Sequence, residues 1–234
     1  QAERHAPWSP ATPDEAARFL AHTMGLSLTP DDARTLTDRT EGWIAGLQLA
    51  ALSLHDAVDA RRFIAALVGT HQHILDYLVE EVLSAQSAPV QEFLMQTAIL
   101  DRFNAPLCDA LTDRSDSADV LIQLDKGNLF LVPLDAERRW FRYHHLFAEL
   151  LRARLASLRP TAPARLHLGA AQWFEQAGSL EDAIVHALAA GAFDRAATLI
   201  ERTWEPLIHG GQAAPLYRWL EALPVDLART RPLL

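Results

Sequence analysis

Two adjacent histidines, His144 and His145, are the side chains of this sequence best suited to chemistry. They stand in the stretch FRYHHLF, between an aromatic, strand-like run and an apolar, helix-like run. Neighbouring residues point to opposite faces of a strand and do not face one another on a helix, so we do not expect the pair to chelate one ion. His71 and His73 have no cysteine or acid at ligand spacing, although a structural metal site needs a full ligand set. The sequence therefore predicts no metal site.

Nucleophilic catalysis has no candidate group. The sequence contains no GxSxG stretch, the pattern of a strained nucleophile turn. Cys108, the only cysteine, lies beside Leu107 in an apolar stretch, where a small buried hydrophobe is expected. The adjacent carboxylates at 31–32 and 80–81 are expected to mark a helix start and a solvated helix face. We therefore expect no enzyme activity from this chain alone.

Composition argues against nucleic acid and phosphate-loop functions. With 21 Lys and Arg against 30 Asp and Glu, the formal net charge is −9, whereas domains that hold nucleic acid over a broad face are usually basic. The only lysine, Lys126, follows Asp125. A P-loop needs its lysine directly after a glycine, so this chain contains no P-loop.

The same composition predicts a folded protein of the cytoplasm. Hydrophobic residues make up 50% of the chain, enough to bury a core. A single cysteine excludes an intramolecular disulfide and fits a reducing compartment. The longest uncharged apolar run, Trp43–Leu54, has 12 residues, whereas a membrane span needs about 20. The first residues lack the basic and apolar regions of a signal peptide.

Proline, glycine and apolar spacing predict a mainly α-helical chain. Thr12-Pro13 and Thr29-Pro30, each followed by acidic residues, are helix starts. We expect these two helices to reach about Met24 and Arg39. Helical spacing and turn signals predict further helices over residues 44–54, Ala57–Leu67, His73–Gln86, Ala88–Leu100, Asn104–Leu111 and Ser117–Gly127.

A β-hairpin interrupts the helices. Leu129–Leu134 and Arg139–His144 are expected to be its strands, joined by a four-residue loop, and Leu146–Leu155 is again helical. Helices followed by a two-stranded wing are the layout of a winged helix. The helix that usually reads DNA falls in Asp113–Lys126, which carries a net charge of −2 (two basic and four acidic residues). Phosphate contacts need the opposite sign, so packing is favoured over DNA binding as its role.

The last third of the chain is expected to form helical hairpins. Arg159–Pro163 is typical of a short linker. Glycines separate the helices expected beyond it, at Ala164–Ala177, Leu180–Ala190, Phe193–Ile208 and Ala213–Leu223. Short helices with tight glycine turns indicate hairpins of the tetratricopeptide (TPR) type, although no regular 34-residue period is present.

Several segments, in this order, resemble a known family. They are RTEGWIAGLQLAALSL (39–54), HILDYLVEEVL (73–83), QEFLMQTAILDRF (91–103) and GNLFLVPLDAERRWFRYHHLFAELLRARL (127–155). Together they resemble the middle of the MalT-like LuxR-family regulators, the large ATP-binding members of the STAND signalling NTPases. AQWFEQAGSLEDAIVHALAAGAFDRAATLIE (171–201) and RWLEALP (218–224) resemble the start of that family's helical-repeat sensor.

The resemblance implies three domains and a set of partners outside this chain. Residues 1–70 would be the helical arm of a STAND NTPase module, 71–158 the winged helix, and 159–234 the start of a TPR-like sensor. An N-terminal P-loop domain and a C-terminal LuxR-type helix-turn-helix would complete the protein. ADP or ATP would bind the intact protein rather than this fragment alone. An inducer, a small molecule or a protein, would bind the repeats, and the activated protein would self-associate.

Two motifs of the family match residues of this chain. Gly42-Trp43-Ile44-Ala45 falls where relatives carry a Gly-Leu-Pro-Leu loop that packs on adenine, with Ile44 in place of the usual proline. Tyr143-His144-His145-Leu146 resembles the family's Met-His-Asp motif. The resemblance implies that His144 contacts the β-phosphate of ADP, while His145 stands in place of the acid.

The chemistry around His144 allows this contact. An imidazole N–H can donate to phosphate, and the N-terminus of the helix that follows favours anions. The nearby Arg138, Arg139 and Arg142 are expected to add positive potential. The alternative is that His144 only caps the helix and His145 is exposed.

The function implied is that of a central regulatory segment in an ATP-dependent transcription activator. The segment would couple nucleotide state to inducer sensing and self-association. A free-standing helical protein–protein interaction module is the main alternative, and a winged-helix DNA binder is a third.

Overall fold

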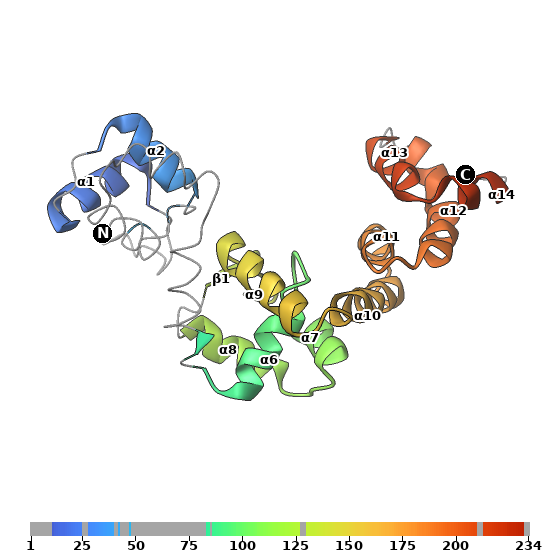
Figure 1. Cartoon of the computed structure of the whole chain (residues 1–234), viewed down its shortest axis with the longest axis horizontal. Coiled ribbons are helices and arrows are strands. Elements are labelled where there is room, and N and C mark those ends of the chain that lie inside the picture. The colour runs from blue at the N-terminus through green and yellow to red at the C-terminus, as the bar shows by residue number, and fades with distance from the viewer. Residues whose placement is uncertain are drawn as a thin grey trace. The chain divides into compact units, whose positions relative to one another are not determined.

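The computed structural model describes residues 11–24, 28–39, 42, 47, 83–84, 86–126, 130–209 and 213–231 (Figure 1). These residues form α-helices and one two-stranded antiparallel sheet, which confirms the predicted, mainly α-helical fold class. The chain divides into two compact units, Gln1–Ala85 and Gln86–Leu234. The helices predicted at 44–54, Ala57–Leu67 and His73–Gln86 lie almost wholly outside the described residues. No helix within the described ranges is long and apolar enough to cross a membrane.

The first unit contains helices α1 (Pro13–Met24) and α2 (Pro30–Arg39). Both begin where the sequence predicts. Thr12 and Glu15 form a reciprocal cap: the Glu15 amide donates to Thr12 Oγ1 at 3.3 Å, and the Thr12 amide donates to Glu15 Oε2 at 2.9 Å. Leu20 and Leu36 are fully buried, so the two helices pack through their apolar faces.

The second unit begins with helices α6 (Ala88–Thr97), α7 (Ala105–Thr112) and α8 (Ser117–Lys126), strands β1 (Leu131–Pro133) and β2 (Phe141–Tyr143), and helix α9 (His145–Leu158). Leu131 pairs with Tyr143 and Pro133 with Phe141. Phe103 adds a bridge to Phe141, with backbone hydrogen bonds of 2.8 and 2.9 Å. Helices with a bridged two-stranded wing are the expected winged-helix layout.

The tip of the wing is held by one carboxylate. Asp135 Oδ1 accepts the backbone amides of Arg139 at 2.7 Å and Trp140 at 3.2 Å. Leu134 continues the ladder beyond β1, because its amide donates to Trp140 O at 2.8 Å. Arg138 has a φ of 52°, in the left-handed region. The regular strands are thus shorter than the predicted ranges, while the turn falls where it was predicted.

Aromatic side chains form the core of the winged helix. The ring centroids of Phe103 and Tyr143 lie 4.6 Å apart, as do those of Phe130 and Phe147. Tyr143 is buried, and its hydroxyl lies 2.7 Å from Thr97 Oγ1. Thr97 donates its own proton to Phe93 O at 2.7 Å, so the Tyr143 hydroxyl is the donor in its bond to Thr97. Strand β2 is thereby fixed to helix α6.

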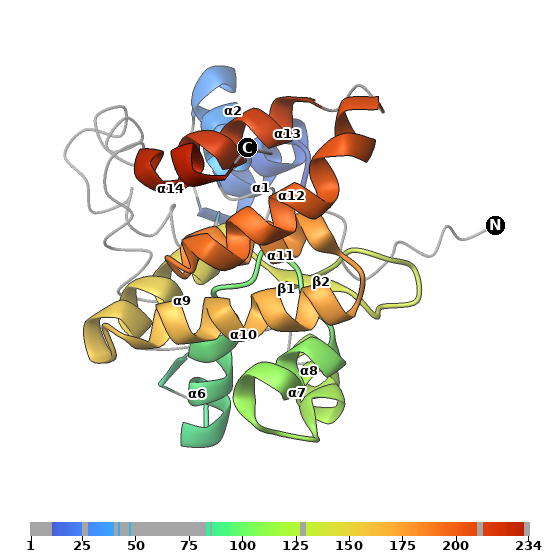
Figure 2. The same ribbon diagram turned by 90° about the vertical axis from the view of Figure 1, so that its right-hand side faces the viewer.

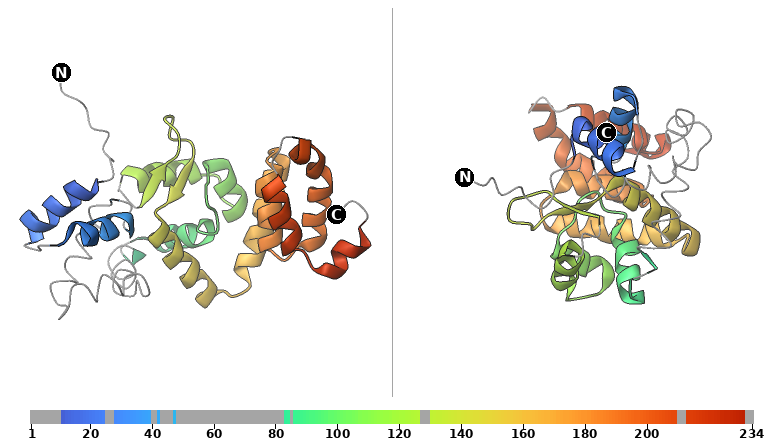
Figure 3. Two further views of the ribbon diagram at one scale, coloured as in Figure 1. Left: turned by 90° about the horizontal axis from the view of Figure 1, so that it is seen from above. Right: turned by 90° about the vertical axis from the view of Figure 1, so that its left-hand side faces the viewer.

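Helical hairpins follow: α10 (Ala162–Gln176), α11 (Leu180–Ala189), α12 (Phe193–His209), α13 (Ala213–Ala222) and α14 (Val225–Thr230). Figures 2 and 3 show α11 and α12 stacked in sequence beyond α10, and α13 and α14 both pack on α12. Gly178 and Gly191 have φ values of 81° and 70° and end helices α10 and α11, a conformation that favours glycine. The predicted linker at Arg159–Pro163 is too long, because α10 already begins at Ala162 with Pro163 in its first turn.

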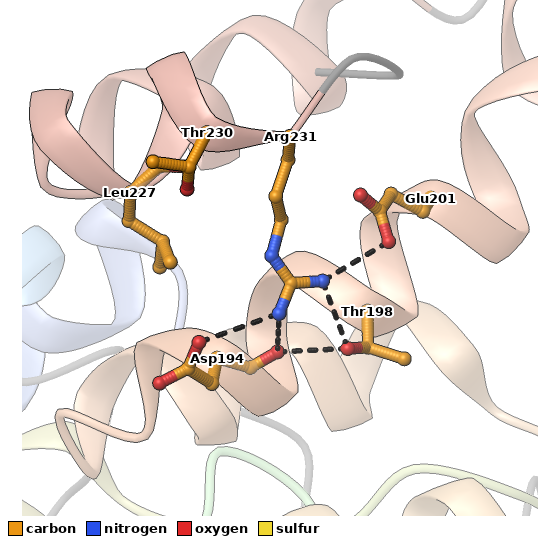
Figure 4. Close-up of polar contacts among 6 residues, drawn as sticks. All are labelled: Asp194, Thr198, Glu201, Leu227, Thr230 and Arg231. Atoms are coloured by element: carbon orange, nitrogen blue, oxygen red, sulfur yellow. Dashed lines mark hydrogen bonds and ion pairs between the residues drawn. The ribbon is translucent and has the colours of Figure 1, made fainter.

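Helix α14 is not among the predicted helices, although Pro224 and Asp226 are helix-start signals. Its end is fixed to α12 by Arg231 (Figure 4). The Arg231 guanidinium donates to Thr198 Oγ1 at 3.1 Å and forms ion pairs with Glu201 at 3.0 Å and Asp194 at 3.3 Å. A short helix that could not persist alone is thus attached by side-chain contacts.

Candidate functional site

His144 lies between strand β2 and helix α9, as predicted. Its backbone amide donates to Phe130 O at 2.8 Å, and its carbonyl accepts the Ala148 amide at 2.9 Å, the first bond of α9. The residue therefore occupies the N-cap position, but its side chain makes no capping hydrogen bond with the helix. The side chain is 1% exposed. His144 is thus the N-cap residue without a side-chain cap, and His145 is half-buried rather than exposed.

The two imidazoles lie on the same side of the chain. Their ring centroids are 4.7 Å apart and their planes are inclined by 29°, a stacked arrangement. The expectation that adjacent residues diverge applies within a regular strand or helix, whereas His144 lies at the junction of the two, with φ −56° and ψ 136°. Even so, within the described ranges no three His, Cys, Asp or Glu side chains gather to hold a metal ion.

His145, rather than His144, borders a surface hollow of about 250 Å³. Arg142 and Arg152 also border it, together with Asp101 and Glu149. Arg152 is already engaged, since it donates to Asp101 Oδ1 at 3.0 Å and to Ala98 O at 2.6 Å. The hollow thus combines basic and acidic groups beside the start of α9.

The predicted positive potential from the three arginines is only partly present. Arg138 forms an ion pair with Asp125, and Arg139 lies near Asp135 and Glu137, at 4.0 and 3.8 Å. These carboxylates offset the charge at the tip of the wing. Of the three arginines, Arg142 alone borders the hollow beside His145.

The stretch Gly42–Ala45, where the resemblance implies packing on adenine, is described only in part. Gly42 has a φ of 69°, and its amide donates to Thr37 O at 2.8 Å, which closes the end of α2. Its carbonyl accepts the Ala11 amide at 2.8 Å. Ile44, the residue proposed to pack on adenine, lies outside the described residues. Gly42 belongs to the first unit and His144 to the second.

Cys108 has the environment of a structural residue. It is fully buried in α7, and burial, with a smaller contribution from Asp109, raises the pKa of its thiol far above the usual value. The reactive form of cysteine is the thiolate, so this side chain is unsuited to nucleophilic catalysis.

Charge on helix α8 is unfavourable for DNA. Two of the basic residues near it are paired, Arg114 with Asp116 at 2.7 Å and Arg138 with Asp125. Asp119 lies in the first turn of the helix, where a reading helix would approach phosphate. That this helix packs rather than reads DNA stays a prediction.

Two side-chain clusters were not predicted, and the first joins the winged helix to the hairpins. Arg102 donates to Asp182 Oδ2 of α11 at 2.6 Å and stacks over the Trp140 ring at 5.1 Å. Trp140 meets Trp173 of α10 edge-on, with centroids 6.5 Å apart. Each contact joins residues distant in sequence, and no local pattern marks such pairs.

The second cluster is a histidine pair between α10 and α11. His167 Nδ1 and His186 Nδ1 lie 2.8 Å apart, and the His186 ring stacks on Phe174. Burial lowers the pKa of His186 to about 4 and also lowers the pKa of His167. Both rings are neutral at physiological pH, and they border a hollow of about 450 Å³. The expected hairpin of α10 and α11 was the only sequence signal that could have brought them together.

Comparison with known proteins matches residues 79–163 to the family of MalT winged helix domains. The serine/threonine-protein kinase PknK of Mycobacterium tuberculosis is 34% identical over 218 residues, which cover 93% of this chain and 20% of PknK. The HTH-type transcriptional regulator MalT of Vibrio parahaemolyticus is 32% identical over 224 residues, covering 94% of this chain and 24% of MalT. MalT of Yersinia pestis is 33% identical over 221 residues, covering 93% and 24%.

These matches confirm the resemblance to MalT-like regulators. The chain spans about a fifth to a quarter of the length of the relatives it matches.

Proposed function

Because this chain carries a winged helix domain of the MalT type, we propose that it is the central regulatory segment of an ATP-dependent transcriptional regulator. The segment would couple the ADP or ATP state of the intact protein to ligand sensing by the helical hairpins and to self-association. It would catalyse no reaction alone. The observation that carries the proposal is the buried histidine at the start of α9 in this domain.

We assign His144 the contact with the β-phosphate of ADP. The 14-residue helix α9 begins directly after it, and a helix N-terminus favours an anion. Stacking on His145 fixes the imidazole plane, and Arg142 supplies a positive charge beside the same junction. These groups favour an anionic ligand, whereas the carboxylates of Asp101 and Glu149 at the same hollow oppose one. Nucleotide, when bound, would supply the negative charge that holds the winged helix in one orientation.

The three relatives support a regulatory rather than a catalytic role. One is named a protein kinase and the others transcriptional regulators, yet each matches this chain over more than 200 residues. A segment shared by proteins of such different names is more readily a switch or sensor than the source of either activity. The alternative function, a free-standing protein–protein interaction module, is supported by the same matches. It differs from the proposed function in that it needs no nucleotide.

The decisive experiment is ADP titration of the intact protein that contains this segment. His144→Ala should weaken ADP retention and raise activity in the absence of inducer, because the closed state loses its phosphate contact. His209→Ala is the matched control, since it removes an exposed imidazole at the end of α12 and leaves His144 and its stacked neighbour intact. Unchanged ADP affinity together with unchanged basal activity in His144→Ala would refute the assignment. It would then favour the interaction module.

A further inference from the structure

Helices α11 and α13 border a third hollow, of about 430 Å³. These two alternate helices of the hairpins contact each other. The hollow is bordered by Glu181, Asp182, Val185, Leu188, Pro215, Arg218 and Trp219. Stacked helical hairpins commonly use such surfaces for binding. We call this hollow the α11–α13 groove.

Opposite charges stand on the two helices that form the groove. Glu181 lies in the first turn of α11, and Arg218 lies on α13; both are exposed. Among the described residues, neither side chain forms an ion pair, with the other or with any third group. Each charge is therefore available to a ligand, one for a cation and one for an anion.

Apolar side chains line the same groove. Val185 is 48% exposed, which is unusual for a valine in the middle of a helix that packs on both neighbours. Leu188 and Pro215 are half-buried, and the buried Trp219 also borders the groove. Small-molecule sites combine such an apolar surface with a few polar groups that fix orientation.

We propose that the α11–α13 groove binds a small zwitterion with an apolar body, of the size and chemistry of a short apolar peptide with free ends. The ligand ammonium lies at Glu181 and Asp182, its carboxylate at Arg218, and its side chains on Val185 and Leu188. Charge complementarity selects a zwitterion over a simple hydrophobe, because a neutral ligand would leave both charges partly desolvated without a partner.

Asp182 couples this groove to the winged helix. Its Oδ2 accepts both the Ser179 hydroxyl and the Arg102 guanidinium, the latter at 2.6 Å. Arg102 in turn stacks over Trp140 in the wing. A ligand ammonium at Asp182 competes with Arg102 for the same carboxylate. Ligand binding would thus weaken the contact between α11 and the wing. The ligand would then bind more tightly to the state in which this contact is broken, which is the condition for coupling two sites.

The use of the groove as a sensor rests on the proposed function, whereas ligand binding itself does not. The test is an NMR titration of the 234-residue chain with L-leucyl-L-leucine. The same dipeptide blocked at both ends, as N-acetyl-L-leucyl-L-leucine amide, has a matched apolar body without charges. We expect saturable shifts at Val185, Leu188 and the Trp219 indole with the free dipeptide, and much weaker binding of the blocked one.

Charge-removing variants locate the contacts. Glu181→Gln and Arg218→Gln should each weaken dipeptide binding roughly fivefold, as expected for exposed charge contacts. Glu221→Gln and Arg229→Gln are matched controls on exposed residues outside the groove and should leave affinity unchanged. Equal affinity for the blocked dipeptide, an unchanged affinity in both groove variants, or an absence of shifts in the wild-type chain would each overturn the proposal.

The Trp140 indole signal reports the coupling. It should shift on dipeptide saturation in the wild type and should no longer respond in Arg102→Gln. A Trp140 signal that ignores the dipeptide in the wild type would overturn the coupling. The proposed function is tested by ADP retention in His144→Ala, which does not involve the groove residues. Failure of the dipeptide to bind and failure of His144→Ala to change ADP retention are therefore separate results.

Discussion

Arg102, in the turn after α6, forms an ion pair of 2.6 Å with Asp182 of α11, 80 positions further along the chain. The pair joins the winged helix to the second helix of the first hairpin. It is partly exposed, with side-chain exposures of 50% for Arg102 and 30% for Asp182. Its neighbours, Trp140 under the guanidinium and Ser179 on the carboxylate, restrict the geometry of both side chains.

A double-mutant cycle of Arg102→Gln and Asp182→Asn should give a coupling energy of up to about 1 kcal/mol, at the upper end for an exposed pair. The Trp140 contact should make the Arg102 variant cost more than the Asp182 variant. Urea unfolding followed at amide signals of α10 and α11 measures the coupling. The same cycle on Arg114 and Asp116, a pair two residues apart, is the control and should give a smaller value. Additive effects at Arg102 and Asp182 would mean that the contact does not join the two parts.

Thr97→Val should destabilise the second unit by about 1–3 kcal/mol, because it leaves the buried Tyr143 hydroxyl without its acceptor. Tyr143→Phe in the Thr97→Val background removes that hydroxyl and should recover much of the loss. Urea unfolding of the two variants and the wild type tests this. If Tyr143→Phe restored nothing, the cost would have to come from Thr97 packing and its own bond to Phe93 instead.

Arg231→Gln should release α14 from α12 while changing global stability by less than about 1 kcal/mol. The Arg231 side chain is only 22% exposed and contacts two carboxylates and a hydroxyl, so its loss should raise hydrogen exchange across Val225–Thr230. Arg229→Gln removes an exposed charge from the same helix and serves as the control. Equal exchange in the two variants would show that the Arg231 contacts do not hold the helix.

Stability of the second unit should fall as pH drops from 6.5 towards 4. Burial, and then His167, lowers the pKa of His186 to about 4, against 6.5 for an ordinary histidine, while Asp101 and Asp182 partly oppose this. Between pH 6.5 and 4 the unfolded chain therefore binds a proton at this histidine that the folded chain does not bind. The free energy of unfolding falls by on the order of 3 kcal/mol by pH 4. Above pH 6.5 both states are neutral and the effect vanishes.

His186→Gln should flatten this pH dependence, since glutamine does not titrate. Unfolding by urea at pH 7.0, 5.5 and 4.5 measures the difference between the two proteins. His209→Gln, an exposed histidine at the end of α12, should leave the slope unchanged. If the free energy of unfolding had the same pH dependence in the wild type and in His186→Gln, His186 would not be the source of that dependence.

Local sequence signals predicted most of the helices. Thr12 and Thr29 begin helices because their side chains accept backbone amides of the first turn, and those bonds depend only on neighbouring residues. Boundaries after α9 were less accurate. A proline can stand inside the first turn of a helix as well as in a linker, and Pro163 does the former.

The candidate site was predictable in position and not in geometry. The change from strand to helix placed His144 at the junction. The stacking of His144 on His145 depends on the backbone angles of that one residue, which no periodic pattern encodes. Charge neutralisation of Arg138 by Asp125 joins the wing to α8 across 13 positions, and such pairing follows from tertiary packing.

The contact between Trp140 and Trp173 has an optical consequence. Two indoles with centroids 6.5 Å apart and planes inclined by 75° are close enough for their electronic transitions to mix. Mixing produces a pair of circular-dichroism bands of opposite sign, which disappear when the rings separate. The circular-dichroism bands of these two indoles therefore report whether the wing and α10 stay in contact, and no added label is needed.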